Sequence, residues 1–133
     1  MELTELIQRT LVRLSLAEYP KEACGILTQH ELVQMPNGSP LPEESFVMDD
    51  EGDRILYQPE SGILPYDFHG YAIWHSHPRS RAVPTRPDMD LMRQTLTPMI
   101  IVSLMTTVPE IAVFKLDEHN RFRACCVRTY RHN

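Results

Sequence analysis

The stretch "YAIWHSHP", residues 71–78, narrows the choice of fold more than any other part of the sequence. Its apolar residues run up to two histidines, His75 and His77, and Pro78 follows at once. A short apolar run is typical of a buried strand, and proline ends it because proline has no N–H to donate. Side chains at i and i+2 share one face of a strand, so the two imidazoles are expected side by side at about 7 Å, while Ser76 faces the other way.

The remaining segments predict helices and strands without a regular strand–helix–strand repeat. Apolar residues at helical spacing predict a helix from Leu3 that stops near Tyr19, because Pro20 disfavours helical backbone just before it. Further helices are predicted for residues 49–57 and 88–97. Strands are predicted for a hairpin within 23–35 and for residues 71–77, 99–106, 110–116 and 121–127. This order favours an α+β fold with a single mixed sheet, in one domain spanning residues 1–133.

Composition excludes several classes of function. A chain of 133 residues can bury a core without a disulfide or metal staple, so a metal would serve chemistry rather than folding. Thirteen basic and eighteen acidic residues give a net charge of −5, which argues against nucleic acid as a partner. The charged N-terminal segment predicts neither a signal peptide nor a membrane partner. Three cysteines without paired spacing argue against a disulfide scaffold, so reduced thiols are expected. Together these features predict a soluble, cytoplasmic protein.

An acidic residue stands where it can join the two histidines. Asp88 follows His77 by eleven positions, at the expected start of a helix, and the intervening loop allows the chain to return. Two imidazoles and one carboxylate are a known catalytic zinc set, which leaves the fourth position open for water. Asp90 competes as a ligand, but two residues along a helix are about 200° of rotation, so only one of the two acids can face the histidines.

Each of these residues also has a simpler explanation when it is taken alone. Paired histidines on a strand are more often incidental than metal-binding. Asp88 suits the first turn of a helix, where the dipole favours a negative charge. Thr85 fits a helix cap equally well, and Glu22 by itself is an exposed acid at the start of a strand. The prediction of a metal site therefore depends on the combination.

The combination resembles the JAMM (MPN+) metallopeptidases. Their pattern has His-x-His-Pro, then Pro-Ser/Thr and an acid, with a glutamate far upstream before a glycine-containing strand. Here "HSHP" at residues 75–78, Pro84, Thr85 and Asp88 match it, and Glu22 lies in "KEACGIL". The phrases "PN", "SFVMD" and "MIIVSL" add similarity to the compact bacterial and archaeal members.

The resemblance implies a curved sheet flanked by helices, in an architecture related to that of cytidine deaminases. It also implies three ligands for Zn²⁺, which are His75, His77 and Asp88. Glu22 would be the general base. Thr85 replaces the family serine that donates a hydrogen bond to the oxyanion, and its β-branch stiffens the side chain. Ser76, inside the motif, completes the set of catalytic candidates.

The function implied is that of a zinc-dependent peptidase or isopeptidase. Compact relatives act on the Gly-Gly tails of small ubiquitin-like or sulfur-carrier proteins, and the loops 36–45 and 58–69 are candidates for setting specificity. The oligomeric state stays open, with a homodimer as one option. Two alternatives also stay open: a non-catalytic MPN-type scaffold, and a non-haem iron oxygenase with two histidines and one carboxylate, which would leave Glu22 and "PTRPD" unexplained.

Overall fold

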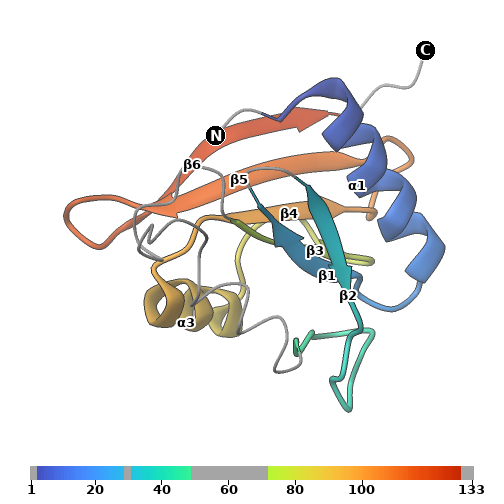
Figure 1. Cartoon of the computed structure of the whole chain (residues 1–133), viewed down its shortest axis with the longest axis horizontal. Helices are drawn as coiled ribbons and strands as arrows, with labels where there is room; N and C mark the ends of the chain where they lie inside the picture. Colours follow the sequence, from blue (N-terminus) through green and yellow to red (C-terminus); the bar gives the residue numbers. More distant parts are fainter. Residues whose placement is uncertain (1–2, 29–30, 49–71, 130–133) are drawn as a thin grey trace.

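Strand β3 (Ala72–His77) lies near the middle of a six-stranded sheet, and all six of its side chains are buried. The computed structural model describes residues 3–28, 31–48 and 72–129. In this part of the chain the strand order is β2-β1-β3-β4-β5-β6 (Figure 1). The other strands are β1 (Cys24–Leu27), β2 (Leu32–Met35), β4 (Met99–Ser103), β5 (Glu110–Leu116) and β6 (Phe122–Thr129). The pair β3–β4 is parallel and the other neighbouring pairs are antiparallel, which confirms a mixed sheet.

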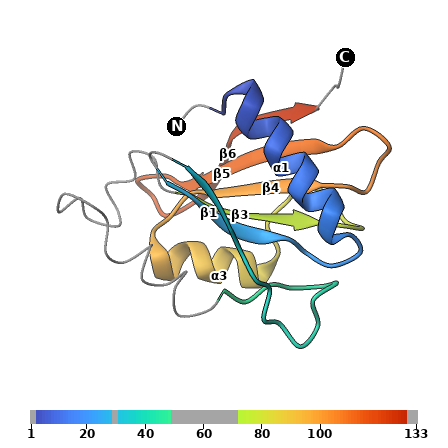
Figure 2. The same cartoon turned by 45° about the vertical axis from the view of Figure 1, so that its right-hand side comes forward.

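Helices α1 (Glu5–Glu18) and α3 (Arg86–Thr95) pack against opposite faces of this sheet, as Figures 1 and 2 show. Leu11 of α1 belongs to a core cluster with Trp74, whereas Met92 of α3 belongs to a second cluster with Ile73. Alternate side chains of β3 therefore enter the two layers in turn, as the strand period requires. The α+β fold with helices flanking one mixed sheet is confirmed.

Most predicted elements are present, with local shifts at their ends. The first helix ends at Glu18 with Tyr19 as its C-cap, and Cys24–Leu27 pairs with Leu32–Met35 as the predicted antiparallel hairpin. Strand β4 ends at Ser103, short of residue 106, because its parallel partner β3 ends at His77. The Leu104 N–H makes the last bond of this pairing, to the His77 carbonyl. The helix predicted for residues 49–57 and the loop 58–69 lie outside the described residues.

Helix α3 begins two residues earlier than predicted because Thr85 caps it. The Thr85 hydroxyl accepts a hydrogen bond from the Asp88 N–H, and Pro87 occupies the first turn, where its fixed φ and missing N–H are tolerated. Asp88 is therefore the third residue of the helix rather than its first. No helix in the described ranges has the length and apolar character needed to cross a membrane.

Gly25 leaves room for the Trp74 side chain to lie over strand β1. The Trp74 indole crosses over Gly25 and donates from Nε1 to the Val33 carbonyl at 3.1 Å. A Cβ atom at position 25 would collide with that carbonyl and lie 2.5 Å from Trp74 Nε1. The glycine thus allows a hydrogen bond that ties β3 to β2 across β1.

Candidate metal centre

Three side chains meet at the end of β3 and the first turn of α3. His75 Nε2 and His77 Nε2 lie 3.0 Å apart, and Asp88 Oδ2 lies 3.1 Å from the first and 3.2 Å from the second. All three residues are buried. Asp90, the competing acid, is exposed. Only one of the two acids could face the histidines, and the structure shows that it is Asp88.

The spacing of these three atoms fits a small tetrahedral ion. Zinc binds histidine nitrogen and carboxylate oxygen at about 2.0–2.2 Å, which places neighbouring ligand atoms of a tetrahedron about 3.3 Å apart. The observed separations of 3.0, 3.1 and 3.2 Å are close to this edge length. The donor set and its geometry thus suit a metal with three protein ligands.

Glu22 forms the fourth side of the site. Its carboxylate and the two imidazoles form a buried group whose potential ligand atoms all lie within 4.8 Å of one another. This group could also bind a metal. Asp88 Oδ2 is closer to both imidazoles than the Glu22 carboxylate is, so Asp88 fits the position of a metal ligand better. Glu22 fits a position beside the ligands, where it would not bind the metal itself.

The sheet fixes Glu22 through the residue that follows it. The Ala23 N–H donates to Ser76 Oγ at 2.8 Å, and the Ser76 N–H donates to the Ala23 carbonyl at 2.9 Å. Cys24 then pairs in register with His75. The end of β1 is therefore held directly beside the histidine-bearing end of β3.

This pairing corrects the placement of Ser76 among the catalytic candidates. Ser76 is fully buried and its hydroxyl accepts the Ala23 N–H, so it points away from the two imidazoles. The cause is the alternation of side chains along β3, which sends neighbours to opposite faces. Ser76 holds two strands together and does not line the centre.

The surroundings of the two histidines differ. His77 Nδ1 donates to the Arg81 carbonyl at 2.7 Å, which leaves the Nε2 lone pair free for a metal and is the usual support of a histidine ligand. His75 Nδ1 is buried and has no partner among the described residues. The Phe46 ring instead stacks on His75, with centroids 4.4 Å apart. His77 is oriented by a hydrogen bond and His75 by packing.

The protonation of three of these groups follows from burial and mutual contact. Burial lowers the pKa of His75, which favours the neutral form that a metal ligand needs. Burial acts in the same direction on His77, but its hydrogen bonds to Asp88 and to the Arg81 carbonyl raise its pKa above the ordinary value. Burial acts to raise the pKa of Asp88, but hydrogen bonds from both imidazoles hold it well below its usual range. A metal bound to Nε2 of either imidazole would take the place of the proton in these hydrogen bonds to Asp88.

Burial raises the pKa of Glu22 from 4.5 to about 7. The charge of His77 opposes this increase, while the charge of Asp88 adds to it. Only 5% of Glu22 is exposed, in contrast to the exposed acid that the residue suggests when its sequence position is considered alone. A carboxyl group that titrates near neutrality can accept and return a proton at ordinary pH.

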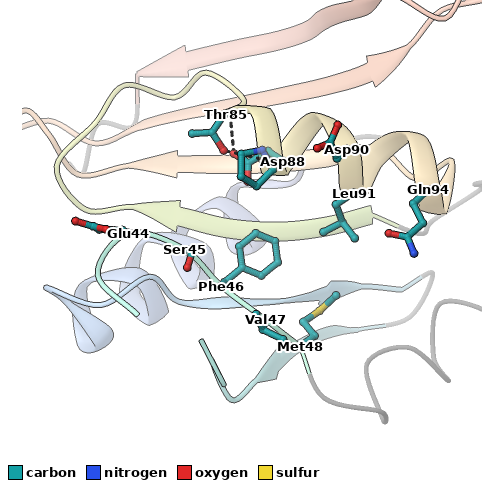
Figure 3. Close-up of a pocket in the computed structure, with 11 residues that line it drawn as sticks. Glu44, Ser45, Phe46, Val47, Met48, Thr85, Asp88, Asp90, Leu91 and Gln94 are labelled. Atoms are coloured by element: carbon teal, nitrogen blue, oxygen red, sulfur yellow. Dashed lines mark hydrogen bonds between the residues drawn. The ribbon is translucent and has the colours of Figure 1, made fainter. Parts of the chain in front are cut away.

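A cleft of about 540 Å³ opens beside the centre, between residues 44–48 and α3 (Figure 3). Phe46, Met48 and Leu91 contribute its apolar lining. Thr85 and Asp88 lie at the end of the cleft formed by the first turn of α3 (Figure 3). The cleft therefore reaches Asp88, the acid of the three-residue centre.

Sequence reasoning missed two residues that organise the site, Phe46 and Asn37. Phe46 packs on His75, and the Asn37 side chain donates to the Glu22 carbonyl at 2.9 Å. Phe46 lies in the phrase "SFVMD" and Asn37 in the phrase "PN". No helical or strand periodicity connects either residue to the histidines. Their importance depends on contacts between segments that are distant in the sequence.

Comparisons with known proteins bear on the family and the fold. A family model described as prokaryotic homologs of the JAB domain matches residues 4–117. The solution structure of protein DSY2949 from Desulfitobacterium hafniense has a TM-score of 0.67 and 20% sequence identity, over 91% of this chain and 86% of that chain. That likeness supports the fold alone. A search of curated proteins gives no match. Because the family model covers most of the chain and every residue of the centre, the chain belongs to the prokaryotic homologs of the JAB domain.

Proposed function

We propose that this protein is a zinc-dependent peptidase or isopeptidase that hydrolyses an amide bond. The observation that carries the proposal is the meeting of His75, His77 and Asp88 within 3.2 Å at a buried site. These three residues would hold the metal. Zinc bound there would lower the pKa of water toward neutrality and polarise a substrate carbonyl.

Glu22 would act as the general base. It is buried beside the histidines, and its raised pKa of about 7 is near the pH at which proton acceptance and return are both efficient. Its carboxylate would take a proton from the attacking water and deliver it to the leaving amine nitrogen. Asp88, with a pKa well below its usual range, stays ionised and is unsuited to this exchange.

Thr85 would stabilise the oxyanion that develops on the substrate carbonyl. Its oxygen accepts a hydrogen bond from the Asp88 N–H, which leaves its own O–H free to donate. The residue is exposed at the end of the cleft, where a substrate carbonyl can reach it. This role and the capping of α3 are compatible, because one uses the proton of the hydroxyl and the other uses a lone pair.

We propose the C-terminal tail of a small ubiquitin-like or sulfur-carrier protein as the substrate. Val47 uses its N–H and its C=O toward Asn37 and Gly38, so the backbone groups of Phe46 and Met48 point to the other side of this extended segment. An extended peptide could pair with them as an added strand and run along the cleft. Glycines at the scissile end suit this path, because a residue without a side chain can approach a buried centre.

The two alternatives account for fewer of the observations. A non-catalytic scaffold does not need two imidazoles and two carboxylates in its interior, and burying such groups is costly. An iron oxygenase would use the same three ligands but would give the buried Glu22 no role.

The deciding experiment compares Glu22→Gln with His77→Ala on a ubiquitin-like precursor extended beyond its Gly-Gly tail. The amide of Glu22→Gln has nearly the same shape, so zinc content should stay near that of the parent while hydrolysis falls by roughly two to four orders of magnitude. His77→Ala should lose zinc and activity together. Cleavage by Glu22→Gln at the parent rate would refute the base assignment, and no cleavage by the parent would favour the scaffold.

A further inference from the structure

The side chain of Asn37 is the centre of a hydrogen-bond network that joins two parts of the site. Its Nδ2 group donates to the carbonyls of Glu22 at 2.9 Å, Ser45 at 3.0 Å and Pro42 at 3.4 Å. Its Oδ1 atom accepts from the N–H groups of Ser39 at 2.9 Å and Val47 at 3.2 Å. All five partners are backbone groups, so the network does not depend on flexible side chains.

One arm of this network ends on Glu22. Asn37 binds the Glu22 carbonyl, and the Glu22 N–H donates to the Pro42 carbonyl, which Asn37 also contacts. Both backbone groups of Glu22 are therefore held by the loop that follows β2. On its other side Glu22 is tied to β3 through Ala23 and Ser76. The Glu22 backbone is thus fixed from two directions.

The other arm surrounds Phe46. Asn37 binds the carbonyl of Ser45 and the N–H of Val47, which are the residues on either side of Phe46. The Gly38 N–H adds a bond to the Val47 carbonyl at 2.9 Å. The Phe46 ring then stacks on His75 and forms part of the cleft. One side chain thus connects the proposed base with the aromatic ring that orients an imidazole.

We infer that Asn37 is a positioning residue, which sets the place of Glu22 for proton transfer and the place of Phe46 against His75. The inference rests on the proposed function. An asparagine suits the task because its amide combines two N–H donors with an oxygen that accepts two bonds. Aspartate has the same shape but no donor when ionised, and it would place a negative charge against three carbonyl oxygens.

Asn37→Asp is therefore a selective test, because it removes the donor bonds and keeps the acceptor oxygen for Ser39 and Val47. We expect zinc content and KM to stay near the parent values while kcat falls about 10- to 100-fold, the usual effect of losing a residue that orients a catalytic group. Ser39→Ala is the matched control. It removes the bonds of Ser39 Oγ to Ser45 Oγ and to the Leu41 N–H in the same loop, without touching Glu22, and its kcat should change less than threefold.

A double variant shows whether Asn37 acts through Glu22. If it does, Asn37→Asp should slow hydrolysis much less in the Glu22→Gln background than in the parent, since effects within one functional unit are not additive. A full additional loss in the double variant would overturn the inference. An equal loss of kcat in Ser39→Ala would also overturn it, because the effect would then belong to the loop in general.

Amide hydrogen exchange of the metal-free protein gives a readout that needs no activity. Asn37→Asp should speed exchange of the Glu22 N–H about tenfold, because losing the Asn37 bonds to the Glu22 and Pro42 carbonyls lets the loop that accepts this N–H open more often. The Val47 N–H should keep its protection. Unchanged exchange at Glu22 would overturn the inference. If the parent cleaves no precursor, the proposed function fails and this exchange measurement still decides whether Asn37 holds Glu22. If Asn37→Asp does not fold, Asn37→Ser, with a single donor, takes its place in the same assays.

Discussion

Thr85 and Asp88 bind each other twice across the first turn of α3. The Thr85 N–H donates to Asp88 Oδ2 at 3.0 Å, and the Asp88 N–H donates to Thr85 Oγ1 at 3.4 Å. The same Oδ2 atom faces His75 and His77. The helix cap and the proposed metal ligand are therefore one group, and substitutions at these two positions must be chosen to separate stability from chemistry.

Asp88→Asn is expected to weaken metal binding with little loss of structure. The amide keeps an oxygen for the Thr85 N–H, but the negative charge that attracts a cation is lost. We expect the parent to bind about one zinc per chain, and Asp88→Asn to bind it at least about 100-fold more weakly. Elemental analysis and competition with a chelating dye measure both quantities.

Asp90→Asn is the control for this prediction, since Asp90 is exposed and should leave zinc affinity unchanged. Equal weakening in both variants would indicate a general charge effect rather than a ligand. Stoichiometric iron in the parent would instead favour the oxygenase alternative.

Thr85→Ala should lose both stability and activity, and Thr85→Ser should keep most of each. Removing an N-cap side chain lowers the free energy of unfolding by about 1 kcal/mol. Removing a donor to the oxyanion lowers kcat by about two orders of magnitude or more. Urea unfolding and steady-state kinetics measure the two effects. If Thr85→Ala loses stability alone, the hydroxyl is only a helix cap.

The stability of the metal-free protein should depend on Glu22 above pH 4.5. Because burial raises the pKa of Glu22 from 4.5 to about 7, the folded state keeps a proton that the unfolded state has lost between these values. The free energy of unfolding therefore falls as pH rises through this window, by roughly 3 kcal/mol in total.

The side chain of Glu22→Gln does not titrate, so this variant should lack this part of the pH dependence of stability. Urea unfolding between pH 4.5 and 8 with a chelator present, compared for parent and variant, isolates the contribution. Parallel slopes would contradict it.

Gly25→Ala should destabilise the fold far more than Gly38→Ala. A Cβ atom at Gly25 collides with the Val33 carbonyl and the Trp74 indole, and overpacking of this kind costs about 3 kcal/mol. A Cβ atom at Gly38 meets its nearest neighbour, the Val47 carbonyl, at an ordinary 3.6 Å. That variant should stay within about 0.5 kcal/mol of the parent. Similar urea midpoints for the two variants would show that the Trp74 indole and the Val33 carbonyl can move aside at low cost.

Local rules predicted the parts of the centre that depend on regular geometry. The strand period placed His75 and His77 on one face, and the helix period separated Asp88 from Asp90. Both outcomes need only the repeat of a single helix or strand, so the sequence of this one chain was sufficient to predict them. The same strand period already turned Ser76 away, and only its membership in the motif made it a catalytic candidate.

Contacts between distant segments were not predictable in this way. The burial of Glu22 depends on the loop containing Pro42 and on Ser76, which lies 53 positions after Ala23. Burial in turn raises the pKa of Glu22, so the chemical character of this residue is a property of the assembled fold. The role of Asn37 could not be predicted for the same reason. Its hydrogen-bond partners are backbone groups, and local sequence patterns do not determine where these groups lie relative to Asn37.

Trp74 is the one tryptophan in the sequence, and it lies next to His75 on β3 but faces the opposite layer. Its ring is fully buried and its nitrogen is engaged by Val33. An indole in such surroundings emits at shorter wavelength than one in water. The tryptophan fluorescence of the protein therefore reports whether the central sheet is intact. Metal loading on the other face should leave this emission nearly unchanged, whereas separation of β1, β2 and β3 should shift it to the red. The chain therefore supplies an optical signal that reports folding independently of the chemistry one residue away.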